Sequence, residues 1–520
     1  GAVAGNGLAS GVTVPVPAGE HAVRVFFDGA GTPLRQWSWA LTAVGALGLI
    51  GLVIWARRGT KPAVAPAASD ARFAVLSVGL ALGLLLGLAR WWADGCANVW
   101  CRSRFDGQAV AGAGVALDVN FGDRLRLIGF DPPAATSADA PLRFTLYWRL
   151  PAPVAEAYSI AVQLWDADGH LVGQQDAWHP GGQPTQRWLA GGYAADAHAL
   201  TPYPGTPAGE YRLMLGVYPA DGQNVEVLDV NGLPLGRVYE VARVNVLAPT
   251  QVPSETELAP ASRLEVALGS VTLVGVDGLG GETTSGAALP LVLYWRARAV
   301  APDAGQQLQL ALAGVVVDTF SLPAGAVVRF PRTVLVPPEV AAGPSSLTAT
   351  VLDSAGAPLA GPAALGAVNV AVPARGFAVP ELPMTLGWRF GDAIELLGLT
   401  PPPATARPGE ALAFTLYWRA LQRLDTRYTV FVHLLDEAGR IAAQLDAAPG
   451  QGARPTTGWL PPEVIADAYT LSLPAELAPG RYQLQAGFYD PVSGARLPVA
   501  AADGAALGDA AGLLTVTLAP

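Results

Sequence analysis

One tetrapeptide, Leu-Tyr-Trp-Arg, occurs three times in this chain, and no other feature constrains the fold as much. The copies lie at 146–149, 293–296 and 416–419, and each ends a segment in which apolar and polar residues alternate. Alternation with a period of two is typical of a β-strand with one buried face. The spacing of the copies shows that each repeat is much longer than the unit of a solenoid. Each repeat is therefore predicted to form a β-sandwich.

The first and third repeats match over much of their length. Each has a Phe-Gly-Asp element, a hairpin with an Asp-x-x-Gly turn, a Pro-Thr-x-x-Trp loop and a Gly-x-Tyr strand. These lie at 121–130, 158–176, Pro184–Trp188 and 208–218 in the first repeat, and at 389–399, 428–446, Pro455–Trp459 and 479–489 in the third. The middle repeat is degenerate, since it has a shorter hairpin and lacks the Pro-Thr-x-x-Trp loop.

Two Pro-rich joints, at 248–262 and 372–383, separate the repeats. The chain has 60 Gly and 45 Pro, too many helix breakers for a helical bundle. We therefore predict three tandem sandwiches of immunoglobulin-like or jelly-roll type, at 104–248, 262–373 and 384–520.

Two apolar runs near the N-terminus predict transmembrane helices at 36–56 and 73–93, flanked by Trp and Arg. Buried core helices are the alternative interpretation. The connecting loop, 57–72, is rich in basic residues and is expected to be cytoplasmic. The expected protein is therefore a multi-pass protein of the bacterial cell membrane, with its N-terminus and its C-terminal domains extracytoplasmic. Its predicted fold class is mainly β, with two N-terminal transmembrane helices followed by three sandwiches.

Residues 1–34 are expected to be the end of an extracytoplasmic β-domain that is truncated in this chain. His21, Val23, Val25 and Phe27 alternate as in a half-buried strand, and one hairpin alone cannot bury a core. The alternative is a short tail that leans on the other domains.

Cys96 and Cys101 are the only cysteines, and they follow the second predicted span. On an oxidising face this pair predicts a small disulfide loop, with free thiols as the alternative. A metal site is not expected, because two sulfurs without a nearby His do not complete a tetrahedron.

The sequence contains no catalytic constellation that we recognise, and no cofactor is expected. It has no H-E-x-x-H, G-x-S-x-G, Walker A or G-x-G-x-x-G motif. The net charge of −10 and the lack of a basic stripe argue against a nucleic-acid partner. The turn that begins at Asp166 faintly resembles a calcium loop, but a plain hairpin turn explains it better.

The tryptophans fall into two groups. Trp148, Trp295 and Trp418 of the repeated tetrapeptide are expected in the cores. Others lie in or beside loops rich in Gly and Pro, where aromatic rings can stack on sugar rings. This second group supplies the candidate ligand-binding residues, with plugging of the sandwich end as the alternative for the loop tryptophans: Trp188, Trp459, Trp178 and His179.

The segment 17–35, Pro-Ala-Gly-Glu-His followed by a strand, Pro-Leu-Arg and a span, resembles the C-terminal part of YfhO-type bacterial membrane proteins. These are similar to GT-C glycosyltransferases, and the repeats look like extracytoplasmic sandwiches appended to such proteins in Chloroflexi-like bacteria. The resemblance implies the non-catalytic C-terminal region of a glycosyltransferase-like protein, with catalytic acids upstream of this chain. Its expected partners are the lipid bilayer and envelope polysaccharide or lipid-linked glycan. The alternative is a stand-alone, membrane-anchored surface protein that binds polysaccharide or acts as an adhesion or spacer module.

Overall fold

A computed structural model describes Gly83, Leu85 and residues 105–519, except 112, 189–190, 221 and 298–304. The two described residues of the second predicted span are helical. Several predicted features otherwise lie outside the described residues: segment 1–34, the spans at 36–56 and 73–93, loop 57–72, and Cys96 with Cys101. Within the described part of the chain, no helix has both the length and the apolar character needed to span a bilayer.

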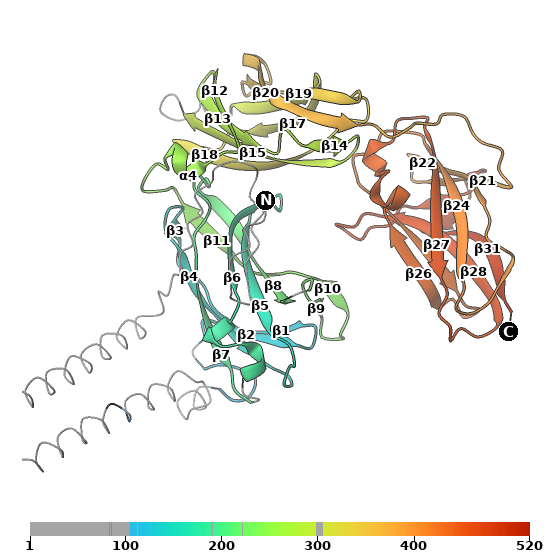
Figure 1. The fold of residues 1–520 in the computed structure, drawn as a ribbon, viewed down its shortest axis with the longest axis horizontal. Coiled ribbons are helices and arrows are strands. Elements are labelled where there is room, and N and C mark those ends of the chain that lie inside the picture. The colour runs from blue at the N-terminus through green and yellow to red at the C-terminus, as the bar shows by residue number, and fades with distance from the viewer. Residues whose placement is uncertain are drawn as a thin grey trace, which may run out of the picture.

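The described residues are mainly β, which confirms that part of the predicted fold class. They form three pairs of antiparallel-rich sheets, and each pair lies within one of the predicted sandwich ranges (Figure 1). We call these units domain 1 (115–247), domain 2 (262–371) and domain 3 (384–518).

Domain 1 pairs a sheet of order β10-β9-β1-β2-β4-β7 with a sheet of order β3-β11-β8-β5-β6. Two short 3-10 helices, η1 (Pro180–Gly182) and η2 (Thr185–Arg187), precede β7. The strands are β1 (Val115–Phe121), β2 (Leu125–Asp131), β3 (Thr136–Ser137), β4 (Leu142–Arg149), β5 (Tyr158–Trp165), β6 (Leu171–Ala177), β7 (Ala194–Leu200), β8 (Gly209–Pro219), β9 (Val227–Leu228), β10 (Pro234–Gly236) and β11 (Tyr239–Leu247).

Domain 3 repeats this topology strand for strand, with sheets of order β27-β24-β22-β21-β29-β30 and β23-β31-β28-β25-β26. Its 3-10 helices are η3 (Pro449–Gly452) and η4 (Thr456–Gly458). The strands are β21 (Met384–Phe390), β22 (Ile394–Thr400), β23 (Thr405–Ala406), β24 (Ala411–Ala420), β25 (Thr429–Leu435), β26 (Ile441–Ala447), β27 (Val464–Ser472), β28 (Gly480–Tyr489), β29 (Val499–Ala500), β30 (Ala506–Gly508) and β31 (Ala511–Leu518).

Domain 2 keeps the same order of main strands but has no counterpart of the β9–β10 hairpin among its described residues. Its sheets are ordered β12-β13-β15-β18 and β14-β20-β19-β16-β17. The strands are β12 (Ser262–Leu268), β13 (Val271–Asp277), β14 (Glu282–Thr284), β15 (Ala288–Ala297), β16 (Gln307–Leu312), β17 (Val315–Ser321), β18 (Val327–Leu335), β19 (Gly343–Leu352) and β20 (Pro358–Ala371). Among the described residues, domain 2 therefore has the framework of the other two domains without some of their peripheral pieces.

Each domain has its own hydrophobic core, centred on the repeated tetrapeptide. Trp148, Trp295 and Trp418 are fully buried, which confirms their predicted place in the core. The third indole packs edge-on between Phe390 and Phe488, with ring centroids 5.4 Å and 4.8 Å away. Alternation along β4, β15 and β24 sends every second side chain into such a core, as the period of a strand requires.

The three domains follow one another without a long linker (Figure 1). Helix α4 (Glu255–Leu258) fills the joint between domains 1 and 2. Its N-terminus is a capping box, in which Ser254 and Glu257 satisfy each other's backbone N–H groups. Because both linkers are short, the ends of neighbouring domains are in direct contact, and loops of one domain meet the next domain at the joints.

Candidate functional site

The loop tryptophan of domain 3 is a core residue, which corrects its prediction as a ligand contact. Trp459 is 1% exposed, and its indole Nε1 donates to the carbonyl oxygen of Arg454 at 2.9 Å. A ring with no exposed face cannot stack on a sugar, so the alternative interpretation, a plug in the sandwich end, holds for this residue.

The same loop in domain 1 is built in the same way but leaves more surface exposed. Trp188 is half-buried, and its Nε1 donates to the carbonyl oxygen of Gln183 at 3.1 Å. Trp178 and His179 lie just before η1 and are both exposed, the former at 48%. Of the four predicted ligand residues, these two present the most surface, and their contact with a glycan remains a prediction.

The threonine of the Pro-Thr-x-x-Trp loop explains why the motif recurs. In domain 1 the hydroxyl of Thr185 accepts from Tyr158 N at 2.9 Å and donates to the carbonyl of Glu156. In domain 3 the hydroxyl of Thr456 accepts from Tyr428 N at 3.0 Å and donates to Thr426 O. The buried hydroxyl thus connects the loop to the start of a strand in the other sheet of the sandwich, β5 in domain 1 and β25 in domain 3.

A buried aspartate accepts a hydrogen bond from the backbone just before each of these loops. Asp467 is 1% exposed and accepts from Gly450 N at 2.9 Å, from Trp418 Nε1 at 3.1 Å and from the hydroxyl of Tyr469. Burial raises the pKa of Asp467 above its ordinary value, although these donors oppose the shift.

Domain 1 places Asp196 at the corresponding position with a different partner. Its carboxylate accepts from Gly181 N at 2.9 Å and lies 2.8 Å from His198 Nε2. The Trp148 indole nitrogen has no hydrogen-bond partner among the described residues. The carboxylate–loop contact is therefore shared by both repeats, while the tryptophan contact occurs in domain 3.

The Asp-x-x-Gly element of domain 1 is a hairpin turn rather than an ion site. Asp166 Oδ1 accepts from the backbone of Asp168 at 3.0 Å and of His170 at 2.8 Å. Burial opposes the shift, but hydrogen bonds from His170 hold the pKa of Asp166 below its ordinary value. No group of three or more acidic, His or Cys side chains in the described residues is arranged to hold a metal.

This turn contacts domain 2 through β18. Arg332 Nη1 lies 2.7 Å from Asp168 Oδ2 of domain 1, and its Nε lies 2.7 Å from Asp318 within domain 2. His170 Nε2 lies 3.1 Å from the hydroxyl of Thr333. Burial lowers the pKa of Arg332, but the hydrogen bonds and negative charges of Asp318 and Asp168 together outweigh this and raise it. The turn is therefore one half of the joint between domains 1 and 2.

A second contact fixes the same joint. The backbone N of Arg329 donates to Gly205 O at 2.7 Å, and its guanidinium carbon lies 4.8 Å above the ring of Tyr203. A cation at this distance is attracted by the ring face. A side chain at position 205 would clash, because a Cβ there would lie 2.9 Å from Arg329 N. Two turns of domain 1 thus meet one strand of domain 2.

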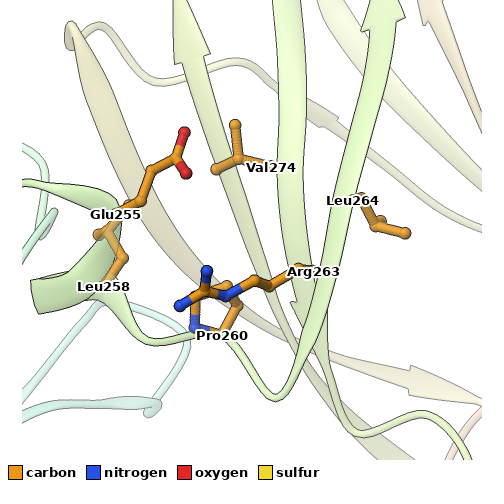
Figure 2. A pocket seen from close by; sticks show the side chains of 6 residues that line it. All are labelled: Glu255, Leu258, Pro260, Arg263, Leu264 and Val274. Atoms are coloured by element: carbon orange, nitrogen blue, oxygen red, sulfur yellow. The ribbon is translucent and has the colours of Figure 1, made fainter.

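The linker at this joint is held by a carboxylate and leaves two small hollows. Asp139 accepts from Thr250 N at 3.0 Å and from its hydroxyl at 2.6 Å, and these hydrogen bonds lower the pKa of Asp139. One hollow, of about 370 Å³, lies between this carboxylate and the prolines of the linker. The other, of about 100 Å³, lies between α4 and β13, with Glu255 and Arg263 at its edge (Figure 2).

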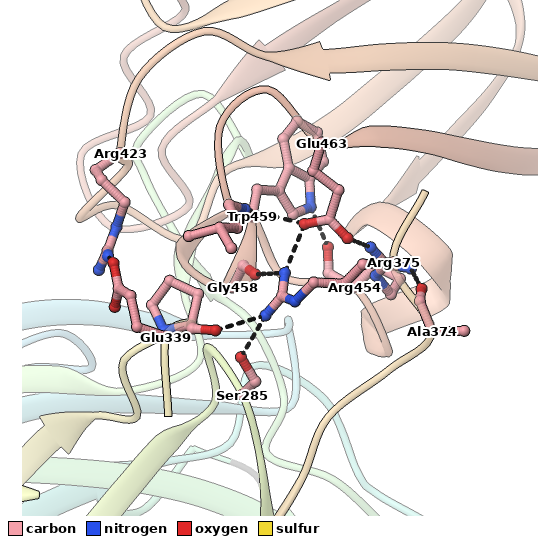
Figure 3. Close-up of polar contacts among 11 residues, drawn as sticks. Ser285, Glu339, Ala374, Arg375, Arg423, Arg454, Gly458, Trp459 and Glu463 are labelled. Atoms are coloured by element: carbon pink, nitrogen blue, oxygen red, sulfur yellow. Dashed lines mark hydrogen bonds and ion pairs between the residues drawn. The ribbon is translucent and has the colours of Figure 1, made fainter. Parts of the chain in front are cut away.

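The joint between domains 2 and 3 is built around one buried carboxylate. Glu463 of domain 3 has no exposed surface, and Arg375 Nη1 in the linker donates to its Oε2 at 2.6 Å. Arg454 donates to the other oxygen, and Leu460 N donates to Oε2 at 2.9 Å. Figure 3 shows both guanidinium groups at this carboxylate. A buried charge is tolerated when it is paired and hydrogen-bonded in this way.

Arg375 also joins the two domains. Its Nη2 donates to Ser285 Oγ at 3.0 Å and to Pro338 O at 2.8 Å in domain 2, while Nη1 donates to Gly458 O at 3.0 Å in domain 3 (Figure 3). One guanidinium therefore bridges the linker, the end of domain 2 and the Pro-Thr-x-x-Trp loop of domain 3.

The backbones of the two domains touch beside this arginine. A Cβ at Gly286 of domain 2 would lie 2.2 Å from Gly458 Cα, and Gly286 has a φ of +81°. The hydroxyl of Thr457 donates to Gly286 O at 2.6 Å, and an ion pair of Arg423 with Glu339 closes the rim. Only glycine allows this approach, so the joint is specified by backbone shape as well as by charge.

Sequence reasoning identified the loops but not their role. It singled out the Asp-x-x-Gly turn and the Pro-Thr-x-x-Trp loop, and the structure brings one copy of each to a domain boundary: the turn of domain 1 and the loop of domain 3. It missed Arg332, Arg375 and Glu463, because their partners lie in other repeats or in the linker. The one usable signal was the position of Arg375 within the predicted Pro-rich joint. The arrangement can hold domains together.

Comparisons with known proteins give little beyond the tandem sandwich architecture. No protein family matches the sequence, and no curated protein matches it either. The YfhO-type and GT-C resemblance therefore stays a prediction.

Solved structures with tandem or single β-domains do align with the chain. A tetra-tandem repeat from the extending region of a large adhesion protein is 14% identical, with a TM-score of 0.15, and covers 76% of each chain. The C-terminal domain of the Streptococcus agalactiae AgI/II polypeptide BspA is 10% identical, with a TM-score of 0.13, and covers 47% of this chain and 96% of its own. Escherichia coli alpha-2-macroglobulin is 11% identical, with a TM-score of 0.15, and covers 72% of this chain and 30% of its own. Scores this low carry no argument about function.

Proposed function

We propose that residues 105–519 are a non-catalytic, extracytoplasmic array of sandwiches that acts as a spacer and docking region of a glycosyltransferase-like bacterial membrane protein. Residues 36–56 and 73–93 anchor it in the bilayer. The alternative remains a stand-alone surface protein with the same anchor. In both versions the array carries a partner or a glycan at a set distance from the membrane.

One observation carries this proposal: one copy of each repeated loop lies at a domain joint. The Asp-x-x-Gly turn of domain 1 meets Arg332 of domain 2, and the Pro-Thr-x-x-Trp loop of domain 3 meets Arg375 and Gly286. Loops that fix neighbours in place are what a spacer needs. An independent flexible domain would not bury a carboxylate such as Glu463 at its boundary.

The sidedness can be tested with a single introduced thiol. Ala413 is exposed on β24, and Ala413→Cys is placed in a chain that carries Cys96→Ser and Cys101→Ser. A membrane-impermeant maleimide should label this chain in intact cells or spheroplasts. Labelling only after lysis would contradict the extracytoplasmic location. An intact mass of the native protein far above 53.5 kDa favours the glycosyltransferase-like version, and a mass near it favours the stand-alone one.

A second candidate function, glycan binding, is favoured by the exposed Trp178 beside the exposed His179. Stacking of a sugar on this indole would contribute about 1.4 kcal/mol, so Trp178→Ala should weaken binding of envelope polysaccharide roughly tenfold. Val230→Ala removes a fully exposed apolar side chain elsewhere in domain 1 and is the matched control. Equal affinities for the wild type and Trp178→Ala would exclude this site.

A further inference from the structure

Two copies of the Pro-Thr-x-x-Trp loop occur, but the described residues give a neighbouring domain to only one of them. In domain 3 the loop is covered by domain 2, through Thr457 and Gly458. In domain 1 the loop has the same internal hydrogen bonds, from Thr185 and Trp188. Domain 2 lacks the loop and meets domain 1 through β18 instead. The loop therefore occurs where a preceding domain can sit on it, and the copy in domain 1 is the open one.

The surface around this open loop can be defined by correspondence with domain 3. We call it the N-side end of domain 1, and all its residues are exposed: Pro153, Trp178, His179, Gln186 and Arg187. Pro153 occupies the position of Arg423, which pairs with Glu339 of domain 2. Arg187 occupies the position of Gly458. Phe105, which precedes domain 1 in the chain, packs near the open loop. Its ring lies 5.5 Å from that of Tyr193, which comes between Trp188 and β7.

The sequence before the described region contains a match to one strand of these sandwiches. Residues 17–20 and 207–210 both read Pro-Ala-Gly-Glu. The alternate residues that follow correspond in order, and those of domain 1 are all buried in β8: His21, Val23, Val25 and Phe27 match Tyr211, Leu213, Leu215 and Val217. Residues 17–28 thus carry the pattern of the strand that, with its neighbours, builds the sandwich core. The segment therefore resembles the Gly-x-Tyr strands of domains 1 and 3, with His21 in place of the tyrosine.

We propose that the N-side end of domain 1 is a docking surface for the sandwich to which residues 12–28 belong. The contact differs in detail from the joint of domains 2 and 3. A side chain at Gly458 would lie 2.7 Å from Ser285 O, so Arg187 could not make the same backbone approach. A long cation requires a polar neighbour, and residues 1–34 contain two acids, Glu20 and Asp28, that suit it.

The chain length allows this contact. Residues 94–104 connect the second predicted span to Phe105, and eleven residues reach at most about 40 Å. If both flanks of the spans lie outside the membrane, residues 1–34 and domain 1 emerge on the same side and within that reach. The inference rests on the proposed function for this sidedness, and on the loop and the repeated strand for the rest.

Photo-crosslinking in native membranes tests the docking surface with the full-length protein. A benzophenone amino acid replaces Pro153 or Arg187, and a third variant carries it at Arg423 as the matched position in domain 3. We expect Arg423 to crosslink to the segment around Glu339, and both domain 1 positions to crosslink to residues 1–34 or to the sequence immediately preceding them. Peptide mass spectrometry identifies the partner. Arg143, which is exposed near the start of β4, is the negative control.

Every other outcome contradicts the proposal. Crosslinks from Pro153 and Arg187 to phospholipid would identify the bilayer as the occupant. Crosslinks between two copies of the chain would identify an oligomer. No crosslink at these positions, with a normal one at Arg423, would show that this end is free. Failure at Arg423 as well would instead overturn the domain array on which the proposed function depends.

Discussion

At the scale of single residues, tryptophans with similar sequence context have opposite roles. Trp459 is part of the core of domain 3, whereas Trp178 is 48% exposed. Neighbouring Gly and Pro residues do not show which of the two is buried. Burial depends on whether the loop places the indole against the core strands, as it does for Trp459. The tetrapeptide tryptophans could be predicted because they lie on strands with strict alternation.

Removing the buried loop tryptophan should destabilise domain 3. Trp459→Ala deletes an indole that packs against Phe488 and should lower the free energy of unfolding by about 3–5 kcal/mol. Trp178→Ala should change it by less than about 0.5 kcal/mol. Hydrogen exchange of the β24 amides reports domain 3, and that of the β4 amides reports domain 1. Trp459→Ala should reduce the protection of the β24 amides. If these amides were equally protected in Trp459→Ala and in Trp178→Ala, Trp459 would not be a core residue.

The buried Asp467 should make the stability of domain 3 depend on pH. Its folded pKa is raised above the ordinary 3.8, so the folded state holds its proton more tightly than the unfolded state. The resulting stabilisation is present below pH 3.8 and is lost as pH rises through the raised pKa. Relative to Asp467→Asn, the wild type should therefore lose stability over this interval. A difference between the two proteins that does not change with pH would contradict this.

At the scale of elements, the strands were predictable and the joints were not. Period-two patterns and turn residues are local signals, so the sequence sufficed to place the sandwiches. The joints depend on side chains far apart in sequence: Arg332 and Asp168 are 164 residues apart, and Arg375 and Glu463 are 88 apart. A repeat found in a sequence says which loops recur, but not which neighbour each copy meets.

The ion pair in the joint of domains 2 and 3 should matter more than ion pairs on the surface. Arg375→Ala leaves Glu463 buried without its bridging partner and should cost about 3–5 kcal/mol. Arg126→Ala, which removes an exposed pair with Asp118, should cost no more than about 1 kcal/mol. Limited proteolysis within 372–383 should accelerate in the first variant alone. Equal cleavage rates would show that Arg375 does not hold the joint.

The backbone contact at Gly286 offers a test that separates strain from crowding. Gly286 and Gly314 have φ angles of +81° and +84°, so replacement by Ala costs each about 1–2 kcal/mol of backbone strain. A Cβ at 286 would also collide with Gly458, whereas the space around 314 is open. Gly286→Ala should therefore open the joint, and Gly314→Ala should leave it closed. The same proteolysis assay distinguishes them, and similar cleavage of both variants would contradict the close contact.

At the scale of the whole molecule, the three domains form one array because, at each boundary, loops of one sandwich contact the neighbouring sandwich. Domains 1 and 3 keep both recurring loops, and domain 2 has lost the parts that its two joints do not use. The architecture predicts a defined separation between the first and last domains. A string of independent beads would give a broad range of separations.

The most direct test of this account is the distance between domains 1 and 3 in the full-length protein. Spin labels at Arg143→Cys on β4 and Ala413→Cys on β24, with Cys96→Ser and Cys101→Ser, allow it to be measured by pulsed electron paramagnetic resonance. We expect a single narrow distance distribution that broadens when Arg332→Ala and Arg375→Ala are combined. A distribution that is already broad with both arginines present would contradict the claim that the polar joints fix the array.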